Sequence, residues 1–442
     1  MCQMCISAYP FVLKTASLRH FLKDSSYKGL TVVEISKLSN GITVASLETY
    51  SPISTVGVVS HAGARFEGSH NKGVAALNRQ MAFKSTTEST QFAIVREIEH
   101  YGGRLHSTTT REHSTTTATG SRDSISTLVD AIADDFTNRE ALLWEVNQAK
   151  SELAIQSAEE AGNGSFQAIE AVHAASFSGG LANALTPAPY AVSALSPDAV
   201  KAYNKAMSTT GNSVLVGVGC QHSDLVAAAE TAFGSAPSGE KPKDSCTFSA
   251  STMLVNAAGP ATYVAVAFEG KPQGEDALKL AVIQHALGAG TDPKWGNSGS
   301  YLSRKLAENK SNTSLVAFNA SYSDTGIIGI VAGAGNAQIG NLVGTVKEII
   351  ADVGKNGLSA DDIAAGKAAV AAAASFIGDD ANVLIEEIGA QVGTHGSYMD
   401  AEATAKKVEA LTPADINKLA KSIFSSKPSV GAYGEVSQVP KF

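Results

Sequence analysis

The chain has 442 residues, 44% of them apolar and 17% charged, and its formal net charge is −8. This length allows roughly two to four domains of about 100–200 residues each. The low charged fraction and ample apolar content exclude a disordered chain, and the acidic balance excludes a general nucleic-acid or membrane-surface footprint.

The N-terminal segment is basic and free of acidic residues. The first 23 residues contain no Asp or Glu but include Lys14, Arg19, His20 and Lys23. This composition is typical of a mitochondrial transit peptide, which we assign to residues 1–25, with an ordinary N-terminus as the alternative.

The cysteines do not form a disulfide framework. The four that are present, Cys2, Cys5, Cys220 and Cys246, are too few for a chain of this length. Cys2 and Cys5 are spaced as a C-x-x-C pair, but no second pair completes a zinc site. We expect Cys220 and Cys246 to be small buried residues with reduced thiols.

The first half of the chain mixes strands and helices. Apolar runs on both sides of Asn40-Gly41 predict a β-hairpin, because this dipeptide tolerates the positive φ values of a type I′ turn. Apolar or β-branched composition predicts further strands. The predicted strands are 32–38, 42–45, 55–61, the pair within 105–119, and 214–218, and the predicted helices are 73–84, 90–101, 122–136, the long pattern 138–177, and the helix after Ser196-Pro197.

The second half repeats this order. Thr412-Pro413 opens a helix before the strand 430–433, just as Ser196-Pro197 does, because Ser or Thr caps the helix and Pro pre-sets its first φ. Lys150 and Lys367 lie in matching long helices, and a strand pair within 315–333 precedes a helix near 337–353. Three matches in one order at nearly one separation predict a duplicated domain.

The domain boundaries follow from this repeat. The stretch from Ser235 to Ser245 is rich in Ser, Pro, Gly and Lys and indicates a linker. We therefore predict an N-terminal domain at 26–234, a linker at 235–246 and a C-terminal domain at 247–442. The uncharged stretch from Thr325 to Thr345 contains too many glycines for a membrane span, so we predict a strand, a turn and the start of a helix there.

No catalytic constellation is evident from the residues alone. His106 and His113 flank a Thr-rich turn, but their spacing does not place both on one strand face and no third ligand accompanies them. His61, Glu67 and His70 lie at a strand end and in the following loop, where a solvated face is the simpler interpretation. Single histidines in helical patterns, His173, His285 and His395, are interpreted as structural. The chain contains no nucleophile elbow, phosphate-binding loop or dinucleotide fingerprint.

Two motifs resemble the pitrilysin-like metallopeptidase superfamily, which includes the mitochondrial processing peptidase subunits. Gly63-Ala64-Arg65-Phe66-Glu67 follows a strand, and Met81-Ala82-Phe83-Lys84 ends the next helix. Peptidases of this superfamily carry H-x-x-E-H on that helix, and here the matching residues are Ala76-Leu77-Asn78-Arg79-Gln80. Both imidazoles and the general base are therefore absent, and Arg79 would repel zinc. The third ligand is expected near Gln156 or Ser157, with Glu152 and Glu159 nearby.

Within the superfamily, the sequence is most similar to the core subunits of ubiquinol–cytochrome c reductase, respiratory complex III. The strings that carry this resemblance are 47–50 with 63–67, 173–177, 181–185, 287–290 and 318–324, and the resemblance covers nearly everything from Leu30 onward.

The resemblance implies an α+β protein of two tandem homologous α/β domains that form a bowl. It implies a non-catalytic subunit, peripheral on the matrix side of the mitochondrial inner membrane, that supports assembly and stability of the complex. The implied partners are core protein 1, cytochrome b, cytochrome c1, the iron–sulfur subunit and small subunits, in a dimeric complex that can join respiratory supercomplexes. We expect no metal, no cofactor and no membrane span in this chain, and haem and iron–sulfur centres in its partners.

The alternative is the non-catalytic α-like subunit of a mitochondrial processing peptidase. That subunit contributes a glycine-rich loop to substrate binding, and Gly288–Arg304 occupies the comparable position. These residues lack a dense glycine run and include Pro293 and Trp295, so we expect a shaped inter-domain loop.

Overall fold

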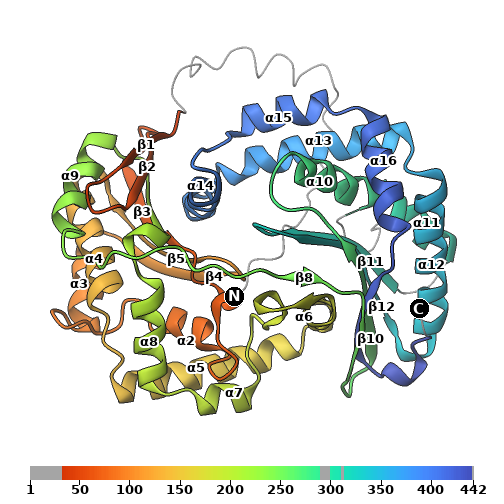
Figure 1. The fold of residues 1–442 in the computed structure, drawn as a ribbon, viewed down its shortest axis with the longest axis horizontal. Coiled ribbons are helices and arrows are strands. Elements are labelled where there is room, and N and C mark those ends of the chain that lie inside the picture. The colour runs from red at the N-terminus through yellow and green to blue at the C-terminus, as the bar shows by residue number, and fades with distance from the viewer. Residues whose placement is uncertain (1–31, 289–298, 310–312, 441–442) are drawn as a thin grey trace.

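A computed structural model describes residues 32–288, 299–309 and 313–440 of the chain, in two halves that lie side by side (Figure 1). Each half contains one main sheet with helices packed against it, so the predicted α+β class is confirmed. The predicted transit peptide, Cys2 and Cys5 lie outside the described residues. Cys220 and Cys246 are free and buried, as predicted.

The first sheet has six strands in the order β1-β2-β7-β3-β5-β4. Their bounds are β1 Glu34–Lys37, β2 Thr43–Leu47, β3 Ile53–Ser60, β4 Arg104–Thr109, β5 Ser114–Ser121 and β7 Ser213–Val218. β1 and β2 pair as the predicted hairpin. The predicted type I′ turn is wrong, because only Gly41 takes a positive φ, 94°, and Leu38 bonds both Gly41 and Ile42 around a longer turn.

The second sheet has five strands in the order β11-β12-β10-β13-β9. Their bounds are β9 Thr252–Asn256, β10 Ala261–Glu269, β11 Thr313–Ser321, β12 Gly326–Gly335 and β13 Ser429–Gly434. β9 runs parallel to β13, as β2 runs parallel to β7 in the first sheet. A short ladder between β6 (Phe177–Ser178) and β8 (Thr247–Phe248) joins the two halves.

The helices repeat between the halves as the sequence predicts. Those of the first half are α2 Val74–Gln80, α3 Gln91–His100, α4 Ile125–Asn138, α5 Leu143–Ala161, α6 Gly164–Ser176, α7 Pro189–Ala194, α8 Pro197–Met207 and α9 His222–Ala232. Those of the second half are α10 Glu275–Leu287, α11 Tyr301–Asn309, α12 Ile339–Asn356, α13 Ala360–Ile377, α14 Ala381–His395, α15 Ala401–Ala410 and α16 Pro413–Phe424.

Local signals explain the repeated helices. Ser196 and Thr412 cap α8 and α16 through their hydroxyl oxygens, each accepting from a backbone N–H three residues on, with Pro in the first turn. The two matched lysines also make equivalent hydrogen bonds. Lys150 donates to the carbonyl of Ser193 near the end of α7, and Lys367 donates to that of Glu409 near the end of α15.

Each half also covers the sheet of the other half. Helix α6 packs on β10 and β13, and helix α14 packs on β3 and β7 (Figure 1). Glycines permit both contacts, since a Cβ on Gly431 would lie 2.3 Å from the Val172 nitrogen and one on Gly389 would lie 2.3 Å from Val59. The halves are therefore interlocked through exchanged helices.

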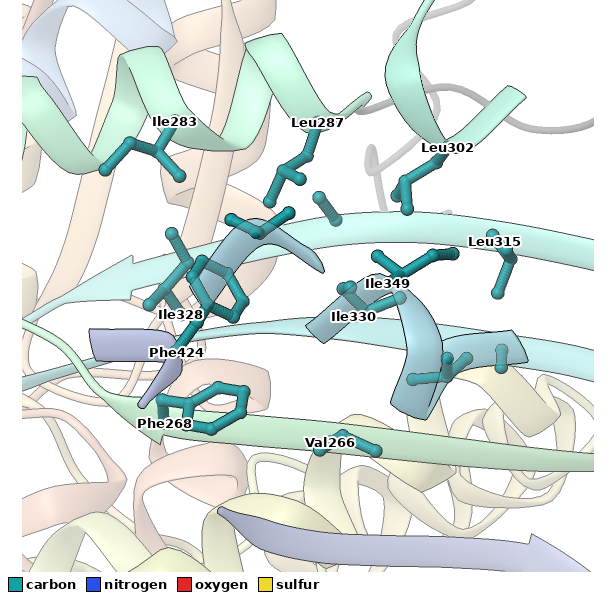
Figure 2. Packing of buried hydrophobic residues seen from close by; sticks show 14 of the residues in the cluster. Val266, Phe268, Ile283, Leu287, Leu302, Leu315, Ile328, Ile330, Ile349 and Phe424 are labelled. Carbon is teal, nitrogen blue, oxygen red and sulfur yellow. The ribbon is translucent and has the colours of Figure 1, made fainter. Parts of the chain in front are cut away.

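The largest core lies in the second half, between its sheet and the helices around it. Phe268 on β10 packs edge-on against Phe424 on α16, with ring centroids 5.1 Å apart. Aliphatic side chains such as Ile283 and Ile328 surround this pair (Figure 2). Among the described residues no single helix has the length and hydropathy to cross a membrane, whereas α13 and α14, at 107° to each other, meet that test only as a bent pair.

Candidate functional site

The turn before α2 is held by a buried carboxylate. Glu67 accepts hydrogen bonds from the backbone nitrogens of Gly73 and Ala75, at 2.8 and 2.9 Å, and so satisfies free N–H groups at the start of α2. Burial raises the pKa of Glu67 to about 7, although both backbone donors favour its charged form. The predicted solvated face is thus wrong for Glu67, while His70 is exposed.

Helix α2 presents the residues that replace the metallopeptidase motif. Ala76 is buried against the apolar cluster shared with α5 and α8. Arg79 and Gln80 both donate to the Oε1 atom of Gln156 on α5, at 2.5 and 3.2 Å. We call Ala76, Arg79, Gln80 and Gln156 the α2 site.

Of the two residues expected near the third ligand position, one contacts α2. Gln156 faces α2, whereas the Ser157 hydroxyl donates to backbone carbonyls of Leu153 and Pro187. The positions at which the resemblance predicts the three ligands therefore hold a methyl group and two amides, beside a guanidinium. Zinc sites in proteins are built from imidazole, thiolate and carboxylate, so the α2 site does not fit zinc. The described residues include no cluster of three or more His, Cys, Asp or Glu that could hold a metal.

An open pocket of about 300 Å³ lies beside the α2 site, between α2, α3, β4 and α5. Arg79, Lys84, His106 and Glu152 place charged or titratable groups in its lining. His106 therefore faces this pocket, and the structure does not pair it with His113. Ser107 also lines the pocket, but its buried hydroxyl makes no hydrogen bond to any described residue, so no base is positioned to activate it.

A second polar cluster lies between the two halves of the molecule. The Arg65 guanidinium, whose side chain is 2% exposed, pairs with Glu112 at 2.6 Å, Asp324 at 2.5 Å and Asp244 at 3.3 Å. Glu112 also accepts from the backbone nitrogen and hydroxyl of Ser323. We call these five residues the junction cluster. Burial alone would lower the pKa of Arg65, but its bonds to Asp324 and Glu112 outweigh burial and raise that pKa.

Further hydrogen bonds surround the junction cluster, one of them between the halves and one within the first half. His173 on α6 accepts from the Tyr322 hydroxyl through Nε2, at 2.8 Å, because its Nδ1 lies 2.7 Å from the Ile169 carbonyl and must donate there. Asn183 donates to the carbonyl of Ala64 at 3.0 Å. His173 is thus structural, as predicted.

Four of the strings that carry the family resemblance therefore meet at one place. Segments 63–67, 173–177, 181–185 and 318–324 all contribute to the junction. Sequence reasoning missed this convergence, because no single segment signals it. The string 47–50 lies elsewhere, where Glu48 binds Arg122, and residues 289–298 of the comparable glycine loop lie outside the described part of the chain.

A histidine pair borders the same junction. The rings of His61 and His113 are 4.6 Å apart, and Lys241 and His61 both donate to the carbonyl of Gly393 on α14. The pKa of each histidine is lowered to about 4, mainly by burial and in smaller part by the charge of Lys241. These two histidines therefore stay neutral near pH 7, which corrects the solvated interpretation of His61.

Comparisons with known proteins agree with this picture. The profile described as Insulinase (Peptidase family M16) matches residues 43–188, and the profile described as Peptidase M16 inactive domain matches 194–370. Cytochrome b-c1 complex subunit 2 from Mus musculus is 31% identical over 415 residues, covering 92% of this chain and 91% of the relative. The Rattus norvegicus protein of the same name is 31% identical over 430 residues, covering 95% and 94%.

More distant relatives belong to the processing peptidases. A probable mitochondrial-processing peptidase subunit alpha-1 from Arabidopsis thaliana is 28% identical over 420 residues, covering 93% of this chain and 83% of the relative. A chain in the solved structure of complex III2 from Candida albicans, with Inz-5 bound, has the same fold, with a TM-score of 0.81 at 20% identity. That likeness covers 93% of this chain and 98% of the other. The resemblance inferred from the sequence, to core protein 2 within this superfamily, is confirmed.

Proposed function

Because this chain belongs to the peptidase M16 family and yet has Ala76, Gln80 and Gln156 at that family's metal-ligand positions, we propose that it is a non-catalytic core subunit of mitochondrial respiratory complex III. Its relatives are named as mitochondrial proteins, and this chain is mitochondrial as well. Its role in the proposal is to support assembly and stability of the electron-transfer complex.

The observation that carries the proposal is the contrast between a lost site and a retained architecture. The α2 site has exchanged ionisable ligands for amides and a cation, so it cannot activate water through zinc. The duplicated fold and the junction between its halves are nevertheless fully formed. A protein with an intact fold but no zinc site is suited to a structural role, in which its surface binds other subunits.

The proposal extends to partners and location. The chain sits peripherally on the matrix side of the inner membrane and contacts core protein 1, cytochrome b, cytochrome c1, the iron–sulfur subunit and small subunits of a dimeric complex. It holds no cofactor of its own, and the haem and iron–sulfur centres belong to those partners. These assignments rest on the similarity to cytochrome b-c1 complex subunit 2.

A native purification tests the proposal. The chain is isolated from mitochondria in mild detergent, and the eluate is examined by a reduced-minus-oxidised spectrum and by its mass. We expect haem b and haem c1 bands in a large dimeric assembly. A haem-free eluate would contradict the proposal.

The second candidate is the α-like subunit of a processing peptidase. The match to the Arabidopsis thaliana peptidase subunit and the open pocket beside the α2 site favour it as the second function. In that case the purification yields a haem-free heterodimer that cleaves presequence peptides. The same eluate therefore distinguishes the two functions.

A further inference from the structure

One edge of the second sheet lacks the protection that the other sheet edges have. β1 carries Glu34 and Lys37, and β4 carries Arg104 and His106. On β11 the backbone nitrogen of Ala317 donates to the carbonyl of Gly288, at 2.9 Å. β9 carries no charge, and no charged residue lies between Ser245 and Phe268. Charges or coverage normally prevent an edge strand from pairing with other chains.

The backbone of β9 is available for pairing along its outer side. The described residues pair β9 with β13 alone, and the Ser251 carbonyl accepts from Val430 while Ala257 donates to Gly434. Backbone groups alternate in direction along a strand, so those of Thr252, Leu254 and Asn256 point away from β13. The side chains of Met253 and Leu254 are 41% and 50% exposed.

The internal repeat shows what is missing at this edge. β2, the counterpart of β9, is covered by β1, which pairs with it antiparallel. The segment before β9 does not fold back in this way. Its residues Thr247 and Phe248 form β8 and pair with β6, and Ser249 donates to the carbonyl of Ser176. The chain thus uses this segment to join its halves, and the part of the chain that the structure describes provides no other strand that covers β9.

We propose that β9 is completed in trans by an extended segment of a partner subunit, which pairs with it antiparallel as β1 pairs with β2. This inference rests on the proposed function, since the segment belongs to another subunit of the same assembly. Strand addition to an open edge is an established mode of recognition, in which main-chain bonds supply affinity and alternate side chains supply specificity.

Charge and area identify the chemistry of this occupant. The edge is uncharged, so a segment without charges at its centre, and with apolar side chains at alternate positions, matches it without leaving a charge unpaired. Five residues of strand extend for about 17 Å, and pairing along that length buries far less than the ~800 Å² per partner of a stable interface. Two copies joined at β9 alone would therefore dissociate, which favours a segment whose own subunit is anchored elsewhere.

Amide hydrogen exchange tests this proposal on the intact protein. Exchange is measured for residues 252–256 in the purified chain and in the native assembly. The backbone N–H groups of Met253 and Val255 point toward β13, so they serve as internal controls that are protected in both samples. We expect the amides of Thr252, Leu254 and Asn256 to exchange at least about tenfold more slowly in the assembly. A tenfold change corresponds to about 1.4 kcal/mol of added stability against the local opening that permits exchange.

Other exchange patterns would overturn the proposal. Equal, fast exchange of the three outward amides in both samples would mean that no strand adds to β9. Slow exchange in the isolated chain with a doubled mass would assign the edge to a second copy, and slow exchange in a monomer would assign it to the chain itself. A chain that purifies without haem proteins would instead contradict the proposed function, so the two failures are distinguishable.

A matched pair of variants isolates the backbone contribution. Leu254→Pro removes one outward N–H and leaves the ladder with β13 intact, because Pro is tolerated on an edge where its nitrogen faces outward. Leu254→Thr removes the apolar side chain but keeps that N–H. We expect Leu254→Pro to lower the assembled fraction about fivefold relative to Leu254→Thr, from one lost hydrogen bond, with similar melting temperatures for the two isolated chains. Equal assembly of both variants would contradict strand addition.

Discussion

The α2 site and the junction cluster both contain an arginine, but the two guanidinium groups differ in burial and in their charged partners. Arg79 lies at an open pocket and donates to the amide oxygen of Gln156. Arg65 is buried between the halves and is neutralised by three carboxylates from three parts of the chain. Most of the sequence strings that carry the family resemblance lie at the junction cluster. The comparison teaches that the contacts joining the two halves are extensive and buried, whereas the positions at which the resemblance predicts a metal site hold residues that do not bind zinc.

The largest predicted effect tests the junction directly. Arg65→Met removes the cation and leaves Glu112 buried without its partner, so we expect a loss of about 3–5 kcal/mol in unfolding free energy. Thermal or denaturant unfolding of the purified chain measures it. Arg122→Met is the matched control, since its pair with Glu48 is more exposed and is worth about 0–1 kcal/mol. Equal melting temperatures for the two variants would contradict the special role of Arg65.

A pH series extends the comparison to the histidine pair beside the junction. The pKa of His113 is about 4 in the folded chain and 6.5 when unfolded, so the unfolded state binds more protons between these values. Stability is therefore retained above pH 6.5 and lost as the pH falls toward 4, by up to about 3 kcal/mol for this histidine.

The charged and titratable groups that surround His61 and His113 affect the same pH range, so the test uses a variant that removes a single titrating group. Lys241 opposes protonation, His61 titrates in the same range, and Glu112 is already engaged with Arg65 and Ser323. His113→Gln removes one titration, so its melting temperature should decline less between pH 6.5 and 4.5 than that of the unmodified chain. Parallel pH profiles would contradict the assignment.

A smaller effect is expected at the hydrogen bond between the halves. Tyr322→Phe removes the hydroxyl that binds Nε2 of buried His173 and leaves that nitrogen without a donor. The expected loss is about 1–2 kcal/mol, which denaturant unfolding can resolve. Tyr301→Phe provides a comparison, because its hydroxyl binds Asp352 within the second half only. Interdomain proteolysis should increase for the first variant and not for the second.

The smallest effect is expected at the α2 site. Arg79→Ala removes a half-exposed donor to Gln156, and we expect a change below about 1 kcal/mol. Quinol oxidation by the purified complex should be nearly unchanged. A collapse of that activity with all subunits still present would show that the α2 site has a role beyond packing and would reverse the comparison.

The helix exchange shows where sequence reasoning reached its limit. The repeat predicted two tandem domains, and the repeated helices and strands are present. Nothing in the sequence of α6 or α14 indicates that each covers the opposite sheet. A helix with one apolar face needs a partner surface, but its pattern does not specify which sheet provides that surface.

Individual side chains give the same lesson at smaller scale. Phe318 lies in one of the strings that carry the family resemblance, yet this ring is half-buried, while Phe268 on β10 is fully buried. The spacing located the expected third ligand only to within one residue, at Gln156 or Ser157. Neighbouring residues on a helix face different directions, so the sequence did not show which of the two faces α2. The solvated interpretation of Glu67 was wrong because its partners, Gly73 and Ala75, depend on how the loop folds back.

The sequence by itself determined the features that short motifs carry and those that appear when one stretch is compared with another. These are the Asn-Gly hairpin, the Pro-capped helices α8 and α16, the duplication, and the replacement of ionisable residues at Ala76, Arg79 and Gln80. Only the tertiary structure decided the convergence on Arg65, the exchanged helices and the open edge of β9. The physical reason is distance along the chain. Capping and turn formation are local, whereas burial of a charge and coverage of a strand depend on segments far apart in sequence, whose contacts no local pattern encodes.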